Sequence, residues 1–212
     1  MKQFLRCQKL IFLVFFFSWM SFGLVQFIFS QNEILLGINT RWNPTLDLLM
    51  PVITLLGDGF FCFLLGVIGL FLSYRLGVTI ILSFALSGLF VQIIKRFIFP
   101  NAYRPAKVLS DILDTLHQVP GIPLRFPSGH TASAFALFTT LAMYSKNKRV
   151  KIALILTPTL VAFSRMYLFV HFPKDVWVGA ITGVTFAVMC HYLLETFWQK
   201  EGRLSFKNIL LK

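Results

Sequence analysis

Between positions 164 and 175, an arginine, a histidine and an aspartate stand among apolar residues. Arg165 and His171 are six positions apart, and His171 and Asp175 are four apart. Pro173 favours a helix start just after His171, which would put Asp175 in the first turn with its carboxylate within reach of the imidazole. A carboxylate fixes the tautomer and orientation of a histidine, so this pair suits nucleophilic attack or proton transfer. The same residues also fit a plain helix start with an interfacial histidine.

A second polar group, Ser128, Gly129 and His130, directly precedes another apolar run. Ser128 is a good helix N-cap, and Gly129 allows close approach of the backbone to a ligand. The free amides of a first helical turn, together with the helix dipole, favour a bound anion. His130 would stand in that turn and donate a proton to the anion. An ordinary helix cap is the alternative.

Cations complete the set of candidate residues. Arg104 and Arg165 carry planar guanidinium groups that suit phosphate oxygens, and Lys95 supplies a point charge. Two histidines, several cations and a helix N-terminus describe a phosphoryl-transfer site. The sequence shows no carboxylate cluster or histidine-rich set beside them, which favours a metal-independent route through a phosphohistidine. We therefore expect no metal site and no cofactor.

These segments resemble the type 2 phosphatidic acid phosphatase superfamily of integral membrane lipid phosphatases. The family pattern is K-x6-R-P, then P-S-G-H, then S-R-x5-H-x3-D, and the second and third motifs are present in full at 127–130 and 164–175. The first motif departs from the pattern, because Lys95 precedes Arg104 by nine positions and Arg96 precedes it by eight. Either residue can fill the first position, and we favour Lys95.

The resemblance implies a role for each matching residue. His171 is the nucleophile that takes the phosphoryl group, Asp175 orients it, and His130 is the general acid that protonates the leaving oxygen. The remaining matching residues hold the phosphate oxygens: Lys95, Arg104, Ser128, Gly129 and Arg165.

Composition indicates where such a site lies. The chain has 212 residues, of which 57% are apolar and 13% charged, about half the charged share of an average soluble domain. We expect an all-α, polytopic membrane helix bundle, with one lipid phosphatase domain over residues 1–212 and a motif core at 95–175. The net charge of +12 falls in short loops between apolar runs, which indicates membrane topology and no nucleic-acid partner. Cys7, Cys62 and Cys190 lack metal-site spacing and suit packing.

The apolar runs predict six transmembrane helices, an extra interfacial helix at about 45–56 and a long outward loop at 97–126. The predicted spans cover about 10–29, 60–74, 77–94, 128–144, 152–169 and 175–198.

The distribution of basic residues predicts the orientation in the membrane. With six spans, the N-terminus, the second-to-third and fourth-to-fifth loops and the C-terminal tail share one side, with three, one, four and four positive charges. By the positive-inside rule this side is cytoplasmic. The candidate site then faces the opposite side, the periplasm of a bacterial inner-membrane protein.

The expected function is hydrolysis of a lipid phosphate. Candidate substrates are undecaprenyl diphosphate, phosphatidylglycerol phosphate, phosphatidic acid and lipid A, and the loop at 97–126 is expected to select among them. A lipid phosphotransferase with the same histidine is an alternative, and a non-catalytic phospholipid carrier is another. The histidine pair argues against the carrier, because phosphate binding alone needs no nucleophile. The partners expected are the lipid substrate and the bilayer, with no obligate protein partner.

Overall fold

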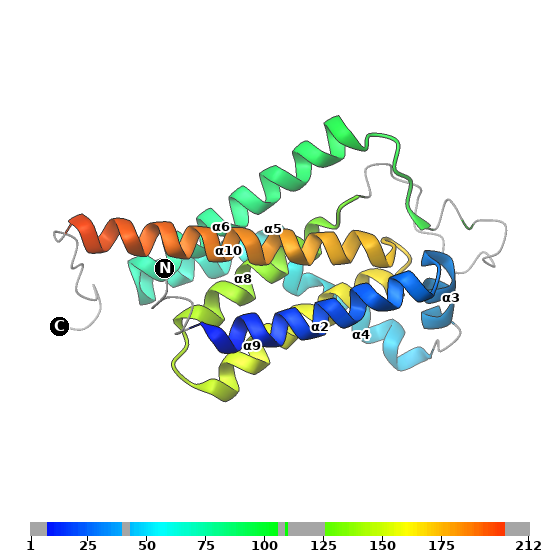
Figure 1. Ribbon diagram of the computed structural model, residues 1–212, viewed down its shortest axis with the longest axis horizontal. Helices are drawn as coiled ribbons and strands as arrows, with labels where there is room; N and C mark the ends of the chain where they lie inside the picture. Colours follow the sequence, from blue (N-terminus) through cyan, green and yellow to red (C-terminus); the bar gives the residue numbers. More distant parts are fainter. Residues whose placement is uncertain (1–7, 40–42, 106–108, 110–125, 202–212) are drawn as a thin grey trace.

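The computed structural model describes residues 8–39, 43–105, 109 and 126–201 (Figure 1). The described residues form helices and no strand, which confirms the all-α prediction. The elements are α2 (Lys9–Ile28), α3 (Gln31–Asn39), α4 (Pro44–Thr54), the 3₁₀ turn η1 (Leu55–Gly57), α5 (Gly59–Leu72), α6 (Tyr74–Ile93), the π-helical turn η2 (Ile94–Ile98), α8 (Gly129–Tyr144), α9 (Lys148–Tyr167) and α10 (Pro173–Glu201). Most of the predicted loop at 97–126 and the tail after 201 lie outside the described residues.

Six spans were expected, and among the described residues four helices are long and apolar enough to cross a bilayer: Ile11–Ile28, Tyr74–Ile98, Lys148–Tyr167 and Pro173–Gln199. A fifth candidate span is the pair Pro44–Gly57 and Gly59–Leu72, bent by 51°. This pair joins the predicted interfacial helix to the predicted second span. The 16 residues of α8 rise roughly 24 Å at about 1.5 Å per residue, less than a hydrocarbon core of about 30 Å.

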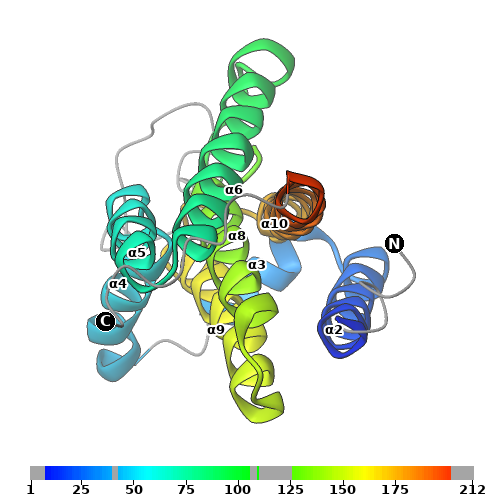
Figure 2. The ribbon, with the colours of Figure 1, turned by 90° about the vertical axis from the view of Figure 1, so that its left-hand side faces the viewer.

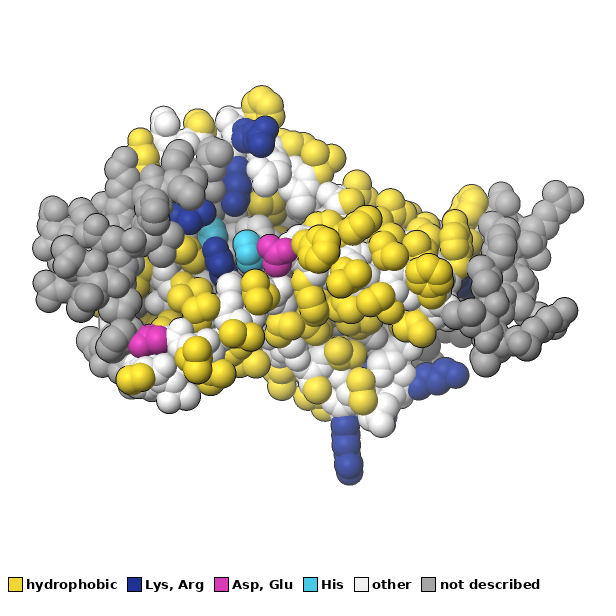
Figure 3. Space-filling model, turned by 180° about the vertical axis from the view of Figure 1, so that it is seen from behind, with side chains coloured by type: hydrophobic (Ala, Val, Ile, Leu, Met, Phe, Trp, Pro, Cys, Tyr) yellow, Lys and Arg dark blue, Asp and Glu magenta, His cyan; other side chains and the backbone are white. Residues whose placement is uncertain are grey.

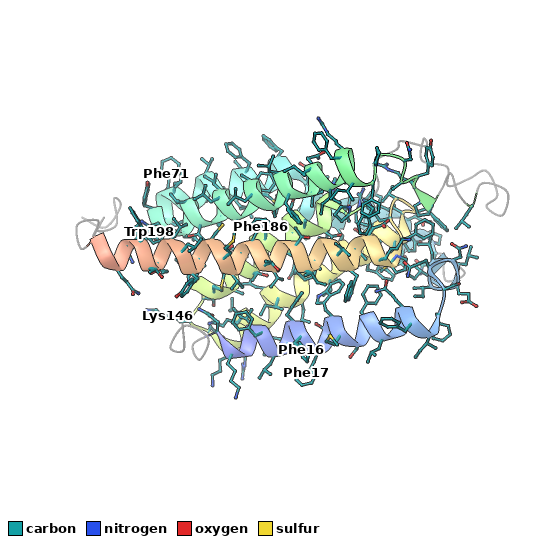
Figure 4. The ribbon with its side chains drawn as sticks, turned by 45° about the horizontal axis from the view of Figure 1, so that its top comes forward. Phe16, Phe17, Phe71, Lys146, Phe186 and Trp198 are labelled. Atoms are coloured by element: carbon teal, nitrogen blue, oxygen red, sulfur yellow. The ribbon has the colours of Figure 1, made fainter. Side chains whose placement is uncertain are left out.

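Helix α8 lies at the centre of the bundle and packs against α6, α9 and α10 (Figure 2). Its buried residues include many small ones, which let the neighbouring backbones approach closely: Ala132, Ser133, Ala134, Ala136 and Ala142. The outer surface carries large exposed side chains instead. Phe16, Phe17 and Phe71 point away from the bundle (Figure 4) and are 55%, 64% and 63% exposed, as expected of a lipid-facing surface.

Two glycines one turn apart allow α10 to pack closely against α8. A Cβ atom at Gly179 would lie 2.6 Å from the carbonyl oxygen of Ser128, and one at Gly183 would lie 2.3 Å from that of Ala132. Only glycine fits at these distances, which is the close approach of a G-x-x-x-G helix pair. One turn before Gly179, the carbonyl of Asp175 accepts a hydrogen bond from the Ser128 amide at 3.0 Å. The packing therefore brings the starts of α8 and α10 together.

The segments expected to share one face of the membrane lie at one end of the bundle. In Figure 1 the end of α2, all of α3 and the turn between α9 and α10 lie on the right. The last turns of α10 and the basic turn between α8 and α9 lie on the left, where Figure 4 labels Lys146. The grouping of the candidate site segments agrees with the sequence, and which end faces the periplasm stays a prediction.

Candidate active site

His171 is positioned by the way α9 ends. Phe169 has a positive φ of 54°. The amide of Phe169 donates to the carbonyl of Met166 at 3.1 Å, and that of Val170 donates to the carbonyl of Arg165 at 3.2 Å. This pair of bonds is a Schellman motif, here with phenylalanine where glycine is usual. The His171 amide also donates to the Arg165 carbonyl at 3.2 Å, and the His171 residue is only 3% exposed.

Asp175 lies in the first turn of α10, as the sequence predicts, and is fully buried. Its Oδ2 atom accepts a hydrogen bond from the Phe172 amide at 2.8 Å and lies 3.5 Å from Nδ1 of His171. The carboxylate therefore sits behind the imidazole on the Nδ1 side. The other ring nitrogen, Nε2, is the one left for chemistry.

Ser128 caps the start of α8, which lies beside the start of α10. Its Oγ atom accepts hydrogen bonds from the amide of Thr131 at 3.4 Å and from the hydroxyl of Thr131 at 2.9 Å. Gly129 and His130 follow in the first helical turn. The first amides of a helix have no partner within the helix, so this end favours an anion.

Lys95 and Arg96, the two candidates for the first cation of the family pattern, have different surroundings in the structure. Both lie in η2, where the backbone leaves the regular α-helix and the amide of Phe99 bonds to the carbonyl of Ile94 at 2.9 Å. Lys95 is half-buried, and its Nζ atom would lie 3.9 Å from a Cβ atom at Gly129. Arg96 is exposed. The ammonium group beside the α8 N-terminus is therefore that of Lys95.

The two arginines offer unused donors. Arg165 is 9% exposed, and its Nη1 atom donates to the hydroxyl of Thr54 at 2.8 Å. The Nε atoms of Arg104 and Arg165 are buried and have no hydrogen-bond partner among the described residues. Buried donors normally have partners, so these two atoms indicate a ligand with acceptor oxygens.

The surroundings of His171 lower its pKa. Burial, followed by the positive charges of Arg165, Lys95, Arg104 and His130, holds the pKa of His171 well below its usual value. The imidazole is therefore neutral at physiological pH, the form that carries a nucleophilic lone pair. Burial also lowers the pKa of Arg104. The positive groups therefore lie near the His171 ring.

Two polar residues of the site were not singled out in the sequence. Thr54 ends α4 and binds Arg165, and Asp58 caps the start of α5 with its Oδ2 atom 3.9 Å from Nε2 of His130. Asp58 is one of only eight acidic residues in the chain and stands between two glycines, which was the available signal. In Figure 3, basic, histidine and acidic side chains gather on one part of the surface, next to a hydrophobic area.

The donor set of this site suits an oxyanion. In the described part of the chain, no group of three or more His, Cys, Asp or Glu residues comes together as a metal site would require. All the predicted site residues lie at the meeting point of η2, α8, α9 and α10. Their catalytic and binding roles remain predictions.

Comparison with known proteins identifies related sequences. The sequence model of the PAP2 superfamily matches residues 76–199, more than half of the chain. Phosphatidylglycerophosphatase B of Bacillus subtilis (strain 168) is 27% identical over 184 residues, covering 81% of this chain and 77% of the relative.

Two crystal structures have a similar fold. Aquifex aeolicus LpxE is 30% identical with a TM-score of 0.65, covering 74% of this chain and 92% of that chain. The first transmembrane PAP2-type phosphatidylglycerolphosphate phosphatase from Bacillus subtilis is 25% identical with a TM-score of 0.64, covering 92% of this chain and 98% of that chain.

Proposed function

The chain belongs to the PAP2 superfamily and is a membrane phosphatase, and from this premise we propose that it hydrolyses a phosphomonoester or diphosphate lipid through a phosphohistidine formed on His171. One observation carries the proposal. A buried, neutral imidazole has a carboxylate 3.5 Å from its Nδ1 atom and several cations around it. A nucleophile held in this way has little use in a site that only binds phosphate.

In the first step, the Nε2 lone pair of His171 attacks phosphorus, and the bond from phosphorus to the lipid oxygen breaks. His130 gives its proton to that oxygen as it leaves. Lys95, Arg104 and Arg165 bind the equatorial phosphate oxygens, where charge develops in the transition state. Asp175 stabilises the positive charge that the substituted imidazole acquires.

In the second step, His130 is neutral and takes a proton from water. The hydroxide equivalent attacks phosphorus, and the bond between phosphorus and Nε2 breaks. Inorganic phosphate leaves, with His171 neutral and His130 protonated as at the start. Each proton taken up in one step is returned in the other, so the cycle needs no metal ion and no co-reactant besides water.

Phosphatidylglycerol phosphate is the substrate we propose first. The Bacillus subtilis relative and the Bacillus subtilis crystal structure are both named as phosphatases of this lipid, and the crystal structure covers 92% of the chain. Undecaprenyl diphosphate, phosphatidic acid and lipid A remain competitors to be tested beside it. We further propose that the protein lies in a bacterial inner membrane with both termini in the cytoplasm and the site at the periplasmic face. The distribution of basic loops supports this orientation.

The test is phosphate release by purified protein from these four lipids in detergent, with EDTA present. Wild type, His171→Ala and His191→Asn are compared, the last being a histidine on α10 far along the chain from the site. We expect release by wild type and His191→Asn and none by His171→Ala. An acid-labile, base-stable phosphoprotein should be trapped with labelled substrate.

Three outcomes would contradict the proposal. A requirement for a divalent cation would overturn the metal-independent mechanism. Phosphate release by His171→Ala would show that His171 is not the nucleophile. Transfer of labelled phosphate to an added lipid acceptor, in place of release, would identify a phosphotransferase with the same intermediate.

A further inference from the structure

We propose that the Asp58 carboxylate is the counter-ion of His130 and holds on this ring the proton that the leaving oxygen takes. The inference rests on the proposed function and adds to it a residue outside the three sequence motifs. Asp58 belongs to the bent α4–α5 pair, far from His130 in sequence. Its action is indirect, because it acts through His130 and not on the substrate.

The two oxygens of Asp58 have different neighbours. The Oδ1 atom accepts a hydrogen bond from the Phe60 amide at 2.8 Å and so caps α5. The Oδ2 atom lies 3.9 Å from Nε2 of His130. That distance is an ion-pair distance and too long for a hydrogen bond, so the carboxylate acts on the ring through its charge. The cap holds the carboxylate in place for this contact.

The backbone beside Asp58 fixes it against α8. A Cβ atom at Gly57 would lie 2.4 Å from the carbonyl oxygen of His130 and 2.8 Å from Val161 Cγ1. The 3₁₀ turn η1 therefore rests directly on the first turn of α8. Because this contact is between main chains, the distance from Asp58 to His130 does not depend on a flexible side chain alone.

The charges around His130 explain why a counter-ion is needed. Burial opposes a positive charge on this ring most strongly, and the charges of Arg165 on α9, Lys95 in η2 and Arg104 oppose it as well. Among the groups that act on His130, Asp58 is the one whose charge favours the protonated form. A bound phosphate would add negative charge, but it departs in each cycle, whereas Asp58 remains.

The contact also assigns the two ring nitrogens. Nε2 faces Asp58, and we assign the remaining ring nitrogen, Nδ1, to the substrate. When the bond from phosphorus to the lipid oxygen breaks, its electron pair goes to that oxygen, which takes the proton from Nδ1. The ring becomes neutral and keeps its Nε2 proton beside the carboxylate. In the second step Nδ1 recovers a proton from water.

Asp58→Asn is the variant that separates this role from a structural one, because asparagine caps a helix about as well as aspartate and carries no charge. Turnover is measured on a lipid phosphate, whose alkoxide must be protonated, and on an aryl phosphate, whose phenolate needs no proton. General acid catalysis contributes about 10²–10⁴-fold. We expect Asp58→Asn to lose about 10-fold or more on the lipid, within that range, and less than about 3-fold on the aryl ester.

Two further measurements bear on the mechanism. The basic limb of the pH profile on the lipid should move to lower pH in Asp58→Asn, because the ring loses its proton more readily. In NMR spectra of histidine-labelled protein without substrate, the titration midpoint of His130 should fall as well. The double variant Asp58→Asn/His130→Ala should be no slower than His130→Ala, because both changes act on one proton.

Asp47→Asn is the matched control. Asp47 lies in the first turn of α4 and accepts a hydrogen bond from the hydroxyl of Tyr167 at 2.7 Å. We expect wild-type turnover on both substrates and an unchanged midpoint for His130. Equal melting temperatures of the three proteins will show that α5 is intact.

The inference is overturned if Asp58→Asn keeps full activity on the lipid, or if it slows both substrates equally. An unchanged His130 midpoint would overturn it too, and this readout needs no catalysis. Failure of the proposed function looks different: wild type would release no phosphate, or His171→Ala would release it at the wild-type rate.

Discussion

At the scale of single residues, the site depends on His171 being neutral although it is buried. The unprotonated ring results from burial and from four nearby positive groups, and the fully buried Asp175 supports it from the Nδ1 side. Such a ring is ready for attack before substrate arrives. When the phosphate anion enters, it offsets the cations, and the carboxylate stabilises the phosphorylated ring.

The pKa of His171 predicts how stability depends on pH. In the unfolded chain this histidine titrates near 6.5, whereas in the folded protein its pKa is well below that value. The unfolded state therefore binds more protons below pH 6.5, and stability is lost as the pH falls, by up to about 1.4 kcal/mol per pH unit. Above pH 6.5 both states are neutral, and this residue contributes no pH dependence.

The measurement is the melting temperature in detergent between pH 8 and pH 5, for wild type and His171→Asn. We expect the wild-type curve to fall relative to the variant below about pH 6.5 and to run parallel above it. A constant difference across the whole range would contradict a depressed pKa in the folded protein.

At the scale of elements, α4 supports α9 through two side-chain contacts. Thr54 accepts a hydrogen bond from Arg165, and Asp47 accepts one from Tyr167. Arg165 also supplies the carbonyl that holds the backbone of His171. Through the Thr54 contact, the bent α4–α5 pair therefore positions the phosphate-binding guanidinium of the residue whose carbonyl holds the His171 backbone.

Replacing Thr54 by valine should weaken phosphate binding, because the Arg165 guanidinium loses the bond that orients it. A hydrogen bond to a charged group contributes about 1.5–3 kcal/mol, so we expect kcat/KM to fall by about 10- to 100-fold. Thr157→Val is the control, since Thr157 bonds only to its own helix at the Ala153 carbonyl. Equal kinetics of the two variants would show that the contact with Thr54 does not position Arg165.

The contact between α8 and α10 should tolerate no side chain at Gly183. Alanine there would place its Cβ atom 2.3 Å from the carbonyl oxygen of Ala132, so the two backbones must separate. Overpacking of this kind costs about 1–3 kcal/mol, and it also moves Asp175 away from Ser128. We expect a lower melting temperature and lower activity.

Gly88→Ala is the matched control on α6, because no atom lies within 4 Å of a Cβ at that position. Alanine is the better helix former, so this variant should be as stable as wild type or more so. If Gly183→Ala has the same melting temperature as Gly88→Ala, the close packing of α8 and α10 does not stabilise the site.

At the scale of the whole molecule, the active-site segments and the basic turn between α8 and α9 lie at opposite ends of the bundle (Figure 1). Lys174 and Lys146 are exposed residues at these two ends. The positive-inside rule predicts that the end with Lys146 is cytoplasmic. The site would then work on lipids of the outer leaflet.

Single cysteines at these two lysines test the orientation in a Cys7→Ser background, in which the remaining cysteines, Cys62 and Cys190, are buried. A membrane-impermeant maleimide should label Lys174→Cys in cells whose inner membrane is intact. It should label Lys146→Cys only after that membrane is permeabilised. The reverse pattern would place the site in the cytoplasm.

The sequence by itself determined the parts of this protein that depend on short-range patterns. Residue spacing places His171 and Asp175 on either side of a helix start, and the serine cap and glycine mark the start of α8. Apolar runs specify membrane helices because hydropathy and length are local properties. The motifs that carry the chemistry are local in the same sense.

The tertiary structure decided which local pieces meet. It placed Lys95 rather than Arg96 beside Gly129, bent the α4–α5 pair, and brought Thr54 and Asp58 to the site. These contacts depend on how closely backbones approach, as at Gly57 and Gly183, and on a bend between two helices. Such contacts are between residues far apart in the chain, so they cannot be predicted from the sequence pattern within one segment.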